Sequence, residues 1–380
     1  MIDFSLSEAQ HALRAKAREF ADREIRPRAR EYDEKGIFPR DIMERAFAEG
    51  IMNESVPAQY GGPGMSNLDA AIITEELGAA CMGIGTSIMA NSLALAPLIL
   101  YGNDAQKEKY LRWHTREFRI AAFCLTEREA GSDAGGMRTR AERDGDYYII
   151  NGDKCFSTNG SYADIYTVFA VTAPNKGPLG VSAFIVERDM GVTPGKTEDK
   201  MGQRASNQAE LHFRDVRVPA ENLLGREGQG FKIAMGTLDR TRAGTAAGAV
   251  GIARRALEEA TAYAAQRVQF GQPLIRNQAI QFKLADMAIK IEAARLLTWQ
   301  AAWMADNNLR QSKESAMAKC FGGDIAMEVT TEAVQIFGGN GYSREYPVEK
   351  LMRDAKLMQI YEGTQEIQRL VIAREIAKGR

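Results

Sequence analysis

Apolar residues recur at helical spacing through the first 118 residues of the chain. Leu13, Ala17 and Phe20 lie three and four positions apart, as on one face of a helix. Ser7 is a good N-cap, so a helix is expected to begin at residue 8, and Pro27 should strain it. The same patterning predicts further helices over residues 39–49, 67–80, 84–101 and 103–118. Residues 1–118 are therefore expected to form an N-terminal helical domain.

The pattern changes between residues 119 and 225, where short β-rich runs are separated by glycines. Such runs occupy residues 147–150, 165–171, 181–186 and 209–213. Asn151-Gly152 follows the first run, and this dipeptide favours a hairpin turn at that point. Residues 119–225 are therefore expected to form a small β-barrel or sandwich domain.

Long helical patterns return in residues 226–380. They cover residues 231–265, 278–307, 312–337 and 364–378. Because the connections between them are short, neighbouring helices should be antiparallel and should form a four-helix bundle. The whole chain is thus predicted to be mainly α with a central β domain.

Charge and composition argue against several classes of function. The chain of 380 residues carries 49 basic and 50 acidic residues, which gives no argument for nucleic-acid binding. Cys81, Cys124, Cys155 and Cys320 form no close pair, and the three histidines show no metal-ligand spacing, so no metal site is expected. The most apolar stretch, residues 82–100, contains glycine, asparagine and proline and is interpreted as a buried helix without membrane contact.

The first residues show neither an apolar core nor an Arg/Ser-rich presequence. A cytoplasmic location is expected on that basis, and a processed form in the mitochondrial matrix stays open.

The segment Tyr361-Glu362-Gly363-Thr364 is the strongest candidate for chemistry. Gly363 permits a sharp turn and close approach of a ligand, and Thr364 can cap the helix that follows. Glu362 could act as a base in that position. The residues alone favour the other reading, in which Glu362 simply complements the positive N-terminus of the helix, as most acids before a helix do.

Together with the helix–β–helix organisation, this segment resembles the acyl-CoA dehydrogenases along essentially the whole chain. In that family the corresponding glutamate removes the substrate α-proton, and Tyr361 and Gly363 would contact the substrate. Leu125–Asp133 and Lys154–Gly160 also resemble family motifs. The residues that would contact the flavin of FAD or lie beside it are Thr126, Ser132, Phe156, Thr158 and Thr364. Without the resemblance, Phe156 would be read as a core aromatic.

Two further motifs imply a site shared between subunits. Arg267-Val-Gln-Phe270-Gly271 resembles the family segment that contacts the FAD diphosphate, which suits a planar guanidinium. Gln335–Tyr342 resembles the segment that reaches the FAD of a neighbouring subunit, with Gln335 and Gly339 at the cofactor. A glycine-rich turn is the alternative reading of this segment. The resemblance implies a homo-oligomer, expected to be a tetramer.

For coenzyme A the resemblance points to Asp239 and Arg242. Some family members carry the base at the position of Thr241; here Glu362 is present instead, which is typical of the short- and medium-chain type. Arg128 and Glu129 depart from the family pattern and leave the nucleotide contacts open.

The implied reaction is FAD-dependent α,β-dehydrogenation of an acyl-CoA, with electrons passed to electron-transfer flavoprotein. Residues 83–100 carry no charge and include Met89, so unbranched acyl groups of about four to eight carbons are expected. A branched short-chain substrate is the alternative, and an acyl-CoA oxidase is a further one.

Overall fold

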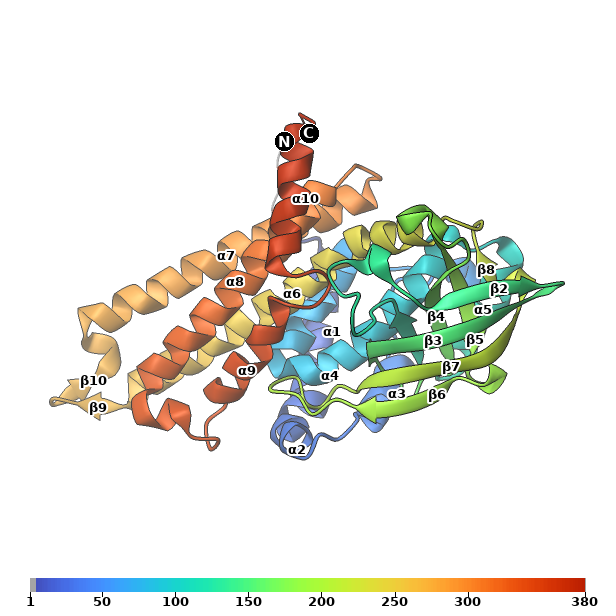
Figure 1. Ribbon diagram of the computed structural model, residues 1–380. Coiled ribbons are helices and arrows are strands. Elements are labelled where there is room, and N and C mark those ends of the chain that lie inside the picture. Colours follow the sequence, from blue (N-terminus) through green and yellow to red (C-terminus); the bar gives the residue numbers. More distant parts are fainter. Residues whose placement is uncertain (1–4, 380) are drawn as a thin grey trace.

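The computed structural model describes residues 5–379 and shows a central sheet with helices on either side along the chain (Figure 1). The N-terminal helices cover one part of the sheet, and the long C-terminal helices extend away from it. This confirms the predicted fold class, mainly α with a central β domain.

The N-terminal part follows the hydrophobic pattern closely. Ser7 caps the first helix through its side chain, as expected. The segment after Phe20 passes through a π turn and a 3-10 turn that contains Pro27, which is the irregularity that proline was expected to cause. The helices are α1 (Glu8–Phe20), α2 (Ala29–Lys35), α3 (Arg40–Ala48), α4 (Asn67–Tyr101) and α5 (Asp104–Arg116).

The helix α4 is broken at Cys81, whose φ of −165° and ψ of 110° are not helical. The two predicted helices before and after this point are therefore confirmed. By length and composition α4 is the one described helix apolar enough to cross a membrane, yet most of its apolar window is buried inside the protein. This burial fits the core helix expected from the sequence.

One sheet forms the middle part. Its strands lie in the order β6-β7-β3-β2-β4-β5-β8, and β1 pairs in parallel with β4. The bounds are β1 (Ala121–Cys124), β2 (Arg140–Asp144), β3 (Tyr147–Thr158), β4 (Ile165–Val171), β5 (Val181–Glu187), β6 (Thr193–Thr197), β7 (Gln208–Pro219) and β8 (Leu223–Leu224). The pattern had indicated β3, β4, β5 and β7 in part and had missed the short strands β1, β2, β6 and β8.

The hairpin predicted at Asn151-Gly152 was wrong. Strand β3 continues through these residues, and the tight turn is Gly145-Asp146 between β2 and β3. Gly152 instead lies at a bulge, where a Cβ atom would meet Thr139 Oγ1 at 2.5 Å. A glycine is thus required there by close packing against Thr139, the residue before β2, and not by a turn.

The C-terminal part contains α6 (Gly230–Gln266), α7 (Gln278–Asp306), α8 (Ser312–Phe337), α9 (Val348–Met358) and α10 (Gln365–Ala377), with the short pair β9 (Val268–Gln269) and β10 (Gln272–Pro273). The helix α9 was missed because it is short and follows a glycine-rich segment. Figure 1 shows β9 and β10 at the end of the molecule that is farthest from the sheet.

Glycines let α4 and α6 approach closely, which fixes the centre of the molecule. A Cβ atom on Gly78 would meet the Gly248 carbonyl oxygen at 2.7 Å, and one on Gly251 would meet the Glu75 carbonyl oxygen at 2.2 Å. On the second half of α4, Met89 lies against Gly244 of α6. The functional cavity lies beside this part of the helix pair.

Candidate active site

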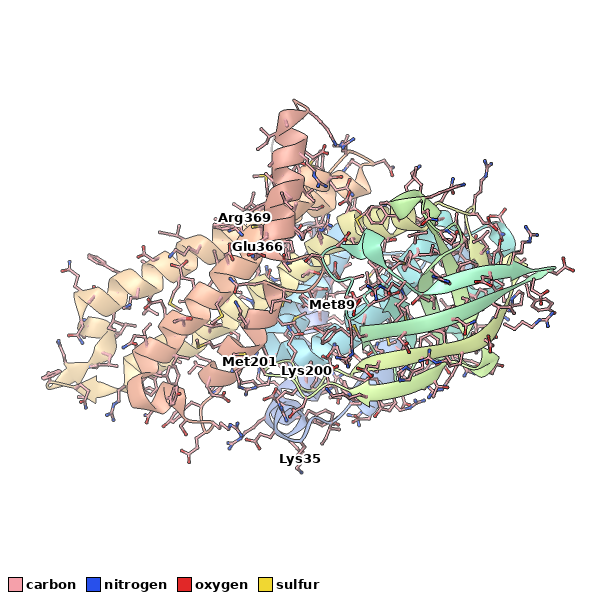
Figure 2. All side chains as sticks on the ribbon, viewed as in Figure 1. Lys35, Met89, Lys200, Met201, Glu366 and Arg369 are labelled. Carbon is pink, nitrogen blue, oxygen red and sulfur yellow. The ribbon has the colours of Figure 1, made fainter. Side chains whose placement is uncertain are left out.

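A cavity of about 830 Å³, here called the central cavity, lies between the second half of α4, the first half of α6, the sheet and the loop before α10. Its size is typical of a small-molecule site. It brings together most of the residues singled out from the sequence: Met89, Thr126, Ser132, Phe156, Thr158, Arg242, Tyr361, Glu362, Gly363 and Thr364. Met89 lies near the middle of the molecule, between the helices and the sheet (Figure 2).

The loop from Tyr361 to Thr364 has an unusual backbone. Glu362 and Gly363 both have positive φ, 54° and 90°. Glycine takes such a conformation freely, but a glutamate does so at a cost, and strain of this kind concentrates at functional sites. The sequence had assigned the turn to Gly363 alone. Thr364 caps α10 by accepting a hydrogen bond from the Ile367 N–H, as predicted.

Two side chains hold this loop in place by hydrogen bonds to its backbone carbonyl oxygens. Lys319 of α8 is buried and donates from Nζ to the Gly363 carbonyl oxygen at 2.7 Å. Gln368 donates to the carbonyl oxygens of Glu362 and Gly363 at 3.0 and 2.9 Å. Burial lowers the pKa of Lys319 to about 8, although the negative charge of Glu362 opposes this shift. A cation is thus placed next to the loop that carries the candidate base.

The Glu362 carboxylate faces the central cavity. Thr241 of α6 donates a hydrogen bond to Glu362 Oε2 at 3.0 Å. Burial raises the pKa of Glu362 above its usual range, while the Thr241 hydroxyl and the Arg242 charge partly offset the rise. A carboxylate with a raised pKa on the wall of an apolar cavity is suited to abstract a proton from a weakly acidic C–H group.

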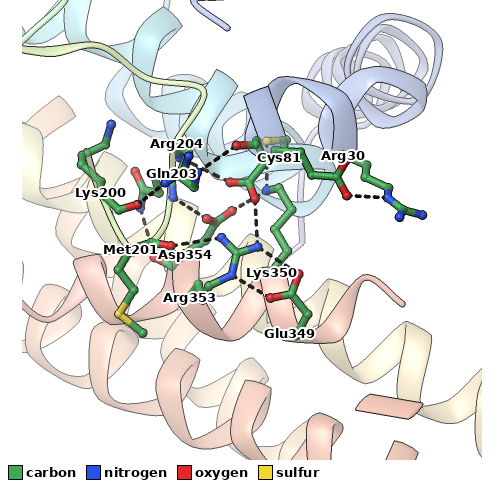
Figure 3. Close-up of polar contacts among 12 residues, drawn as sticks. Arg30, Cys81, Lys200, Met201, Gln203, Arg204, Glu349, Lys350, Arg353 and Asp354 are labelled. Atoms are coloured by element: carbon green, nitrogen blue, oxygen red, sulfur yellow. Dashed lines mark hydrogen bonds and ion pairs between the residues drawn. The ribbon is translucent and has the colours of Figure 1, made fainter. Parts of the chain in front are cut away.

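A network of polar contacts anchors α9, which leads into the loop (Figure 3). Asp354 accepts hydrogen bonds from the Gln203 backbone N–H and from Lys350 Nζ. Gln203 also accepts from Thr86 of α4 at 2.7 Å. Arg353 pairs with Asp33 at the end of α2 at 2.8 Å. Helices from both ends of the chain and the loop between β6 and β7 therefore fix the position of Tyr361 and Glu362.

The predicted coenzyme A residues form an ion pair, and the described lining of the cavity includes Arg242 but not Asp239. Arg242 is buried, lines the cavity and makes an ion pair with Asp239. Ser312 donates to the second oxygen of Asp239 at 2.6 Å, so that carboxylate is held from two sides. Arg242 Nε has no partner among the described residues. A polar ligand group that accepts a hydrogen bond would satisfy it.

The sheet side of the cavity fits a planar ring. Phe156 projects from β3 with 58% of its surface exposed and a φ of 52°. Thr126 and Ser132 lie on the same cavity wall, and Thr158 accepts a hydrogen bond from Gln208 at 3.0 Å. An exposed aromatic beside polar groups in a cavity is a suitable surface for a flavin. This placement differs from the core position that Phe156 would have without the family resemblance.

The remaining predicted cofactor residues do not reach this cavity. Arg267 and Phe270 are exposed and lie at β9, and Gln335 and Gly339 are exposed around the end of α8. This end of the molecule is distant from the sheet in Figure 1. If these residues bind FAD, the FAD must belong to another subunit.

Arg128 and Glu129, the two residues that depart from the family motif, each form an ion pair with another residue at the surface. Arg128 makes an ion pair with Glu210, and Glu129 with Arg138. Glu127 lies in the sequence between Thr126, which is predicted to contact FAD, and these two residues. It is buried and pairs with Lys154 at 2.8 Å. The extra charges are thus neutralised without entering the cavity.

Sequence reasoning missed three residues that the structure places at or beneath the cavity. Lys319 and Gln368 hold the loop, and Glu54 contributes a second carboxylate to the cavity wall. Lys319 is far in sequence from the loop, and Glu54 lies in a loop without a motif, so no local pattern marked them. Gln368 is only five and six residues from Gly363 and Glu362, and its place in the first turns of α10 is the signal that could have found it. Among residues 5–379 no group of His, Cys, Asp and Glu is arranged to hold a metal ion.

A half-buried carboxylate with a raised pKa, on an apolar cavity whose opposite wall suits a flavin, is the arrangement of an oxidoreductase that acts on C–H bonds. Family models for the N-terminal, middle and C-terminal domains of acyl-CoA dehydrogenases match residues 7–117, 122–216 and 228–377. The chain belongs to the acyl-CoA dehydrogenase family, and it is an FAD-dependent enzyme.

Relatives of known description cover the whole chain. A short-chain specific acyl-CoA dehydrogenase of Clostridium acetobutylicum is 45% identical over 99% of this chain and 100% of its own length. The structure of butyryl-CoA dehydrogenase from Megasphaera elsdenii is 46% identical, with a TM-score of 0.97 over 99% of this chain and 100% of that one. A chain from the structure of the electron transferring flavoprotein of Acidaminococcus fermentans is 47% identical, with a TM-score of 0.97 and 99% coverage of both chains.

Proposed function

We propose that the protein dehydrogenates short- to medium-chain acyl-CoAs to trans-2-enoyl-CoAs. The placement of Glu362 carries this proposal, because its carboxylate is desolvated and faces an apolar cavity. Met89, Leu93 and Met235 give the cavity an apolar lining that suits an acyl chain. The similarity to a short-chain specific enzyme and to a butyryl-CoA dehydrogenase supports a short acyl group.

The residues of the chain perform the proton transfer and the orientation of the substrate. Glu362 takes the α-proton at its carboxylate, with Thr241 fixing one oxygen. The backbone N–H of Glu362 donates to no acceptor within the described part of the chain, so it is free for the thioester carbonyl oxygen. A hydrogen bond there stabilises the enolate charge and lowers the pKa of the α-proton. FAD, when bound, supplies the acceptor for the β-hydrogen as hydride.

The electron acceptor is proposed to be electron-transfer flavoprotein. The similarity to a chain in the A. fermentans electron transferring flavoprotein structure supports this partner. An oxidase would instead reduce oxygen, and rapid hydrogen peroxide formation without an added acceptor would reveal it.

We further propose a homotetramer in the cytoplasm in which neighbouring subunits complete the FAD sites. The side chains of Phe270 and Tyr342 are almost fully exposed near the predicted Arg267 and Gln335 contacts. Phe282 and Ile289 of α7 are also exposed, which extends the apolar surface along the same helix bundle. Exposed apolar surface of this kind is typical of a subunit interface.

The substrate assignment is tested by steady-state rates with acyl-CoAs of increasing length and a dye acceptor. The ratio kcat/KM should rise from propionyl-CoA to a maximum between about four and eight carbons, because each buried methylene adds about 0.8 kcal/mol until the cavity ends. A clear preference for glutaryl-CoA over butyryl- and hexanoyl-CoA would contradict the assignment. Isobutyryl- and isovaleryl-CoA, measured alongside, test the branched alternative.

A further inference from the structure

Both ends of the loop that carries Glu362 meet at one carboxylate. Gln359 caps the end of α9, just before the loop, and Gln365 is the first residue of α10, just after it. Their side-chain amides donate to the same oxygen, Oδ1 of Asp324 on α8, at 2.8 and 3.0 Å. The second oxygen of Asp324 accepts from Arg369 at 2.7 Å. Asp324 therefore joins the two ends of the segment 359–365.

Further contacts close the base of the loop against α8. The Gln365 N–H donates to the Gln359 carbonyl oxygen at 3.1 Å. The Gln365 side-chain amide also donates to the Cys320 carbonyl oxygen at 2.6 Å, and its oxygen accepts from Lys319 at 3.1 Å. Because a carboxylate only accepts and a lysine only donates, the buried Gln365 amide satisfies these partners in a single orientation. The base of the loop is thus fixed on one turn of α8.

A glycine lets the backbone of α8 reach the base of the loop. A Cβ atom on Gly323 would lie 2.7 Å from the Met358 carbonyl oxygen and 2.9 Å from Gln365 Nε2. Gly323 directly precedes Asp324, so the close approach and the carboxylate are provided by consecutive residues. The distance between α8 and both ends of the loop is therefore set by close packing as well as by hydrogen bonds.

The loop that is held in this way has a strained backbone at its tip. Glu362 has a φ of 54°, and a residue other than glycine keeps such a value where the surrounding structure determines it. Neither Asp324, Gln359 nor Gln365 is among the residues described as lining the central cavity. Their effect on the reaction must therefore pass through the backbone of the loop, which sets the direction of the Glu362 carboxylate.

We propose that Asp324 is a positioning residue for the base: by joining the two ends of the segment 359–365, it keeps the Glu362 carboxylate directed at the substrate α-carbon. This proposal rests on the function proposed above, in which Glu362 takes the α-proton. It goes beyond that function because it gives a part in proton transfer to a side chain outside the cavity.

The test measures flavin bleaching by butyryl-CoA over a range of concentrations under anaerobic conditions. Asp324→Ala should lower the limiting rate about 10- to 100-fold, because a small misplacement of a reacting group has an effect of this size. The half-saturating concentration and the FAD content should stay near those of the wild type. Glu328→Ala, at an exposed residue one turn later on α8, is the matched control and should bleach at the wild-type rate.

Two variants separate the contact with the glutamines from the contact with Arg369. Asp324→Asn keeps an oxygen that can accept from both Gln359 and Gln365, so it should recover most of the limiting rate. Arg369→Gln removes the exposed partner of the second oxygen and should have little effect. A loss in Arg369→Gln as large as that in Asp324→Ala would overturn the proposal, because the ion pair would then be the important contact.

Gln359→Ala removes one of the two donors and should lower the limiting rate less than Asp324→Ala does. The double variant should be no slower than Asp324→Ala, because both changes break the same junction. If Asp324→Ala does not fold, Gln359→Ala and Asp324→Asn decide: a wild-type limiting rate in Gln359→Ala would then overturn the proposal.

A wild-type limiting rate in folded Asp324→Ala would also overturn the proposal. So would a loss of activity that is confined to a raised half-saturating concentration or to lost FAD, since the orientation of the base would then be unaffected. A wild-type enzyme whose flavin is not bleached by butyryl-CoA would instead contradict the proposed function, so the two failures are distinguishable.

Discussion

The Thr241 hydroxyl donates a hydrogen bond of 3.0 Å to the Glu362 carboxylate. Thr241 lies in the first half of α6, and Glu362 lies 121 positions later in a loop. By resemblance, Thr241 occupies the position at which some members of the family carry their base. The contact explains how either position can supply a base, because both side chains face the same point of the cavity.

Thr241→Val should move the acid limb of the kcat/KM profile to higher pH. Glu362 must be ionised to act, so activity falls as the pH drops through its raised pKa. The Thr241 hydroxyl favours the ionised form, so its loss should raise that pKa further. Rates between pH 5 and 9 measure the shift. Thr241→Ser should keep the wild-type profile, and an unshifted limb in Thr241→Val would show that the hydrogen bond does not tune the base.

Lys319→Met should also move the acid limb to higher pH and lower the rate at neutral pH. It removes a positive charge that holds the pKa of Glu362 down and the hydrogen bond to the Gly363 carbonyl oxygen. Part of the lost rate should return at pH 9, where Glu362 is ionised again. A purely structural role would lower the rate equally at every pH. Lys313→Met, at the half-buried start of the same helix, is the control.

Gly251→Ala should destabilise the fold, whereas Gly244→Ala should not. Both glycines lie inside α6, where alanine is intrinsically favoured by about 1 kcal/mol. A Cβ atom at 251 would lie 2.2 Å from the Glu75 carbonyl oxygen, which is a clash. A Cβ atom at 244 would lie 3.7 Å from Met89 Cε, which is an ordinary van der Waals contact. Overpacking costs about 1–3 kcal/mol, so Gly251→Ala should lower the free energy of unfolding. Gly244→Ala should leave it unchanged or raise it. Urea unfolding measures both, and equal shifts would show that the α4–α6 contact does not limit stability.

Light scattering of the purified yellow protein should give the mass of a tetramer. Gln335→Ala should release FAD more readily on dilution, because a cofactor completed across an interface couples its binding to association. The absorbance of the filtrate after dilution and ultrafiltration measures released FAD. A monomer that retains FAD at micromolar concentration would rule out a shared site.

The sequence predicted the order of helical and β segments because hydrophobic period is a local property. It also identified the loop at Glu362, because the functional residues of this loop are consecutive in the sequence and form a motif. The hairpin at Asn151-Gly152 was wrong because pairing of β3 with β7 and packing on Thr139 override the local turn preference. Lys319 and Glu54 were missed because their roles arise from contacts with α10 and α4, which no short pattern encodes.

The central claim, that Glu362 is the base, is tested most directly by anaerobic mixing of the enzyme with butyryl-CoA in a stopped-flow spectrophotometer. The flavin absorbance of the wild type should bleach within one turnover. Glu362→Gln should bind FAD and substrate but bleach about 10² to 10⁴ times more slowly. Glu366→Gln, an exposed neighbour in the first turn of α10, is the matched control and should bleach at the wild-type rate. Bleaching of Glu362→Gln at the wild-type rate would contradict the account.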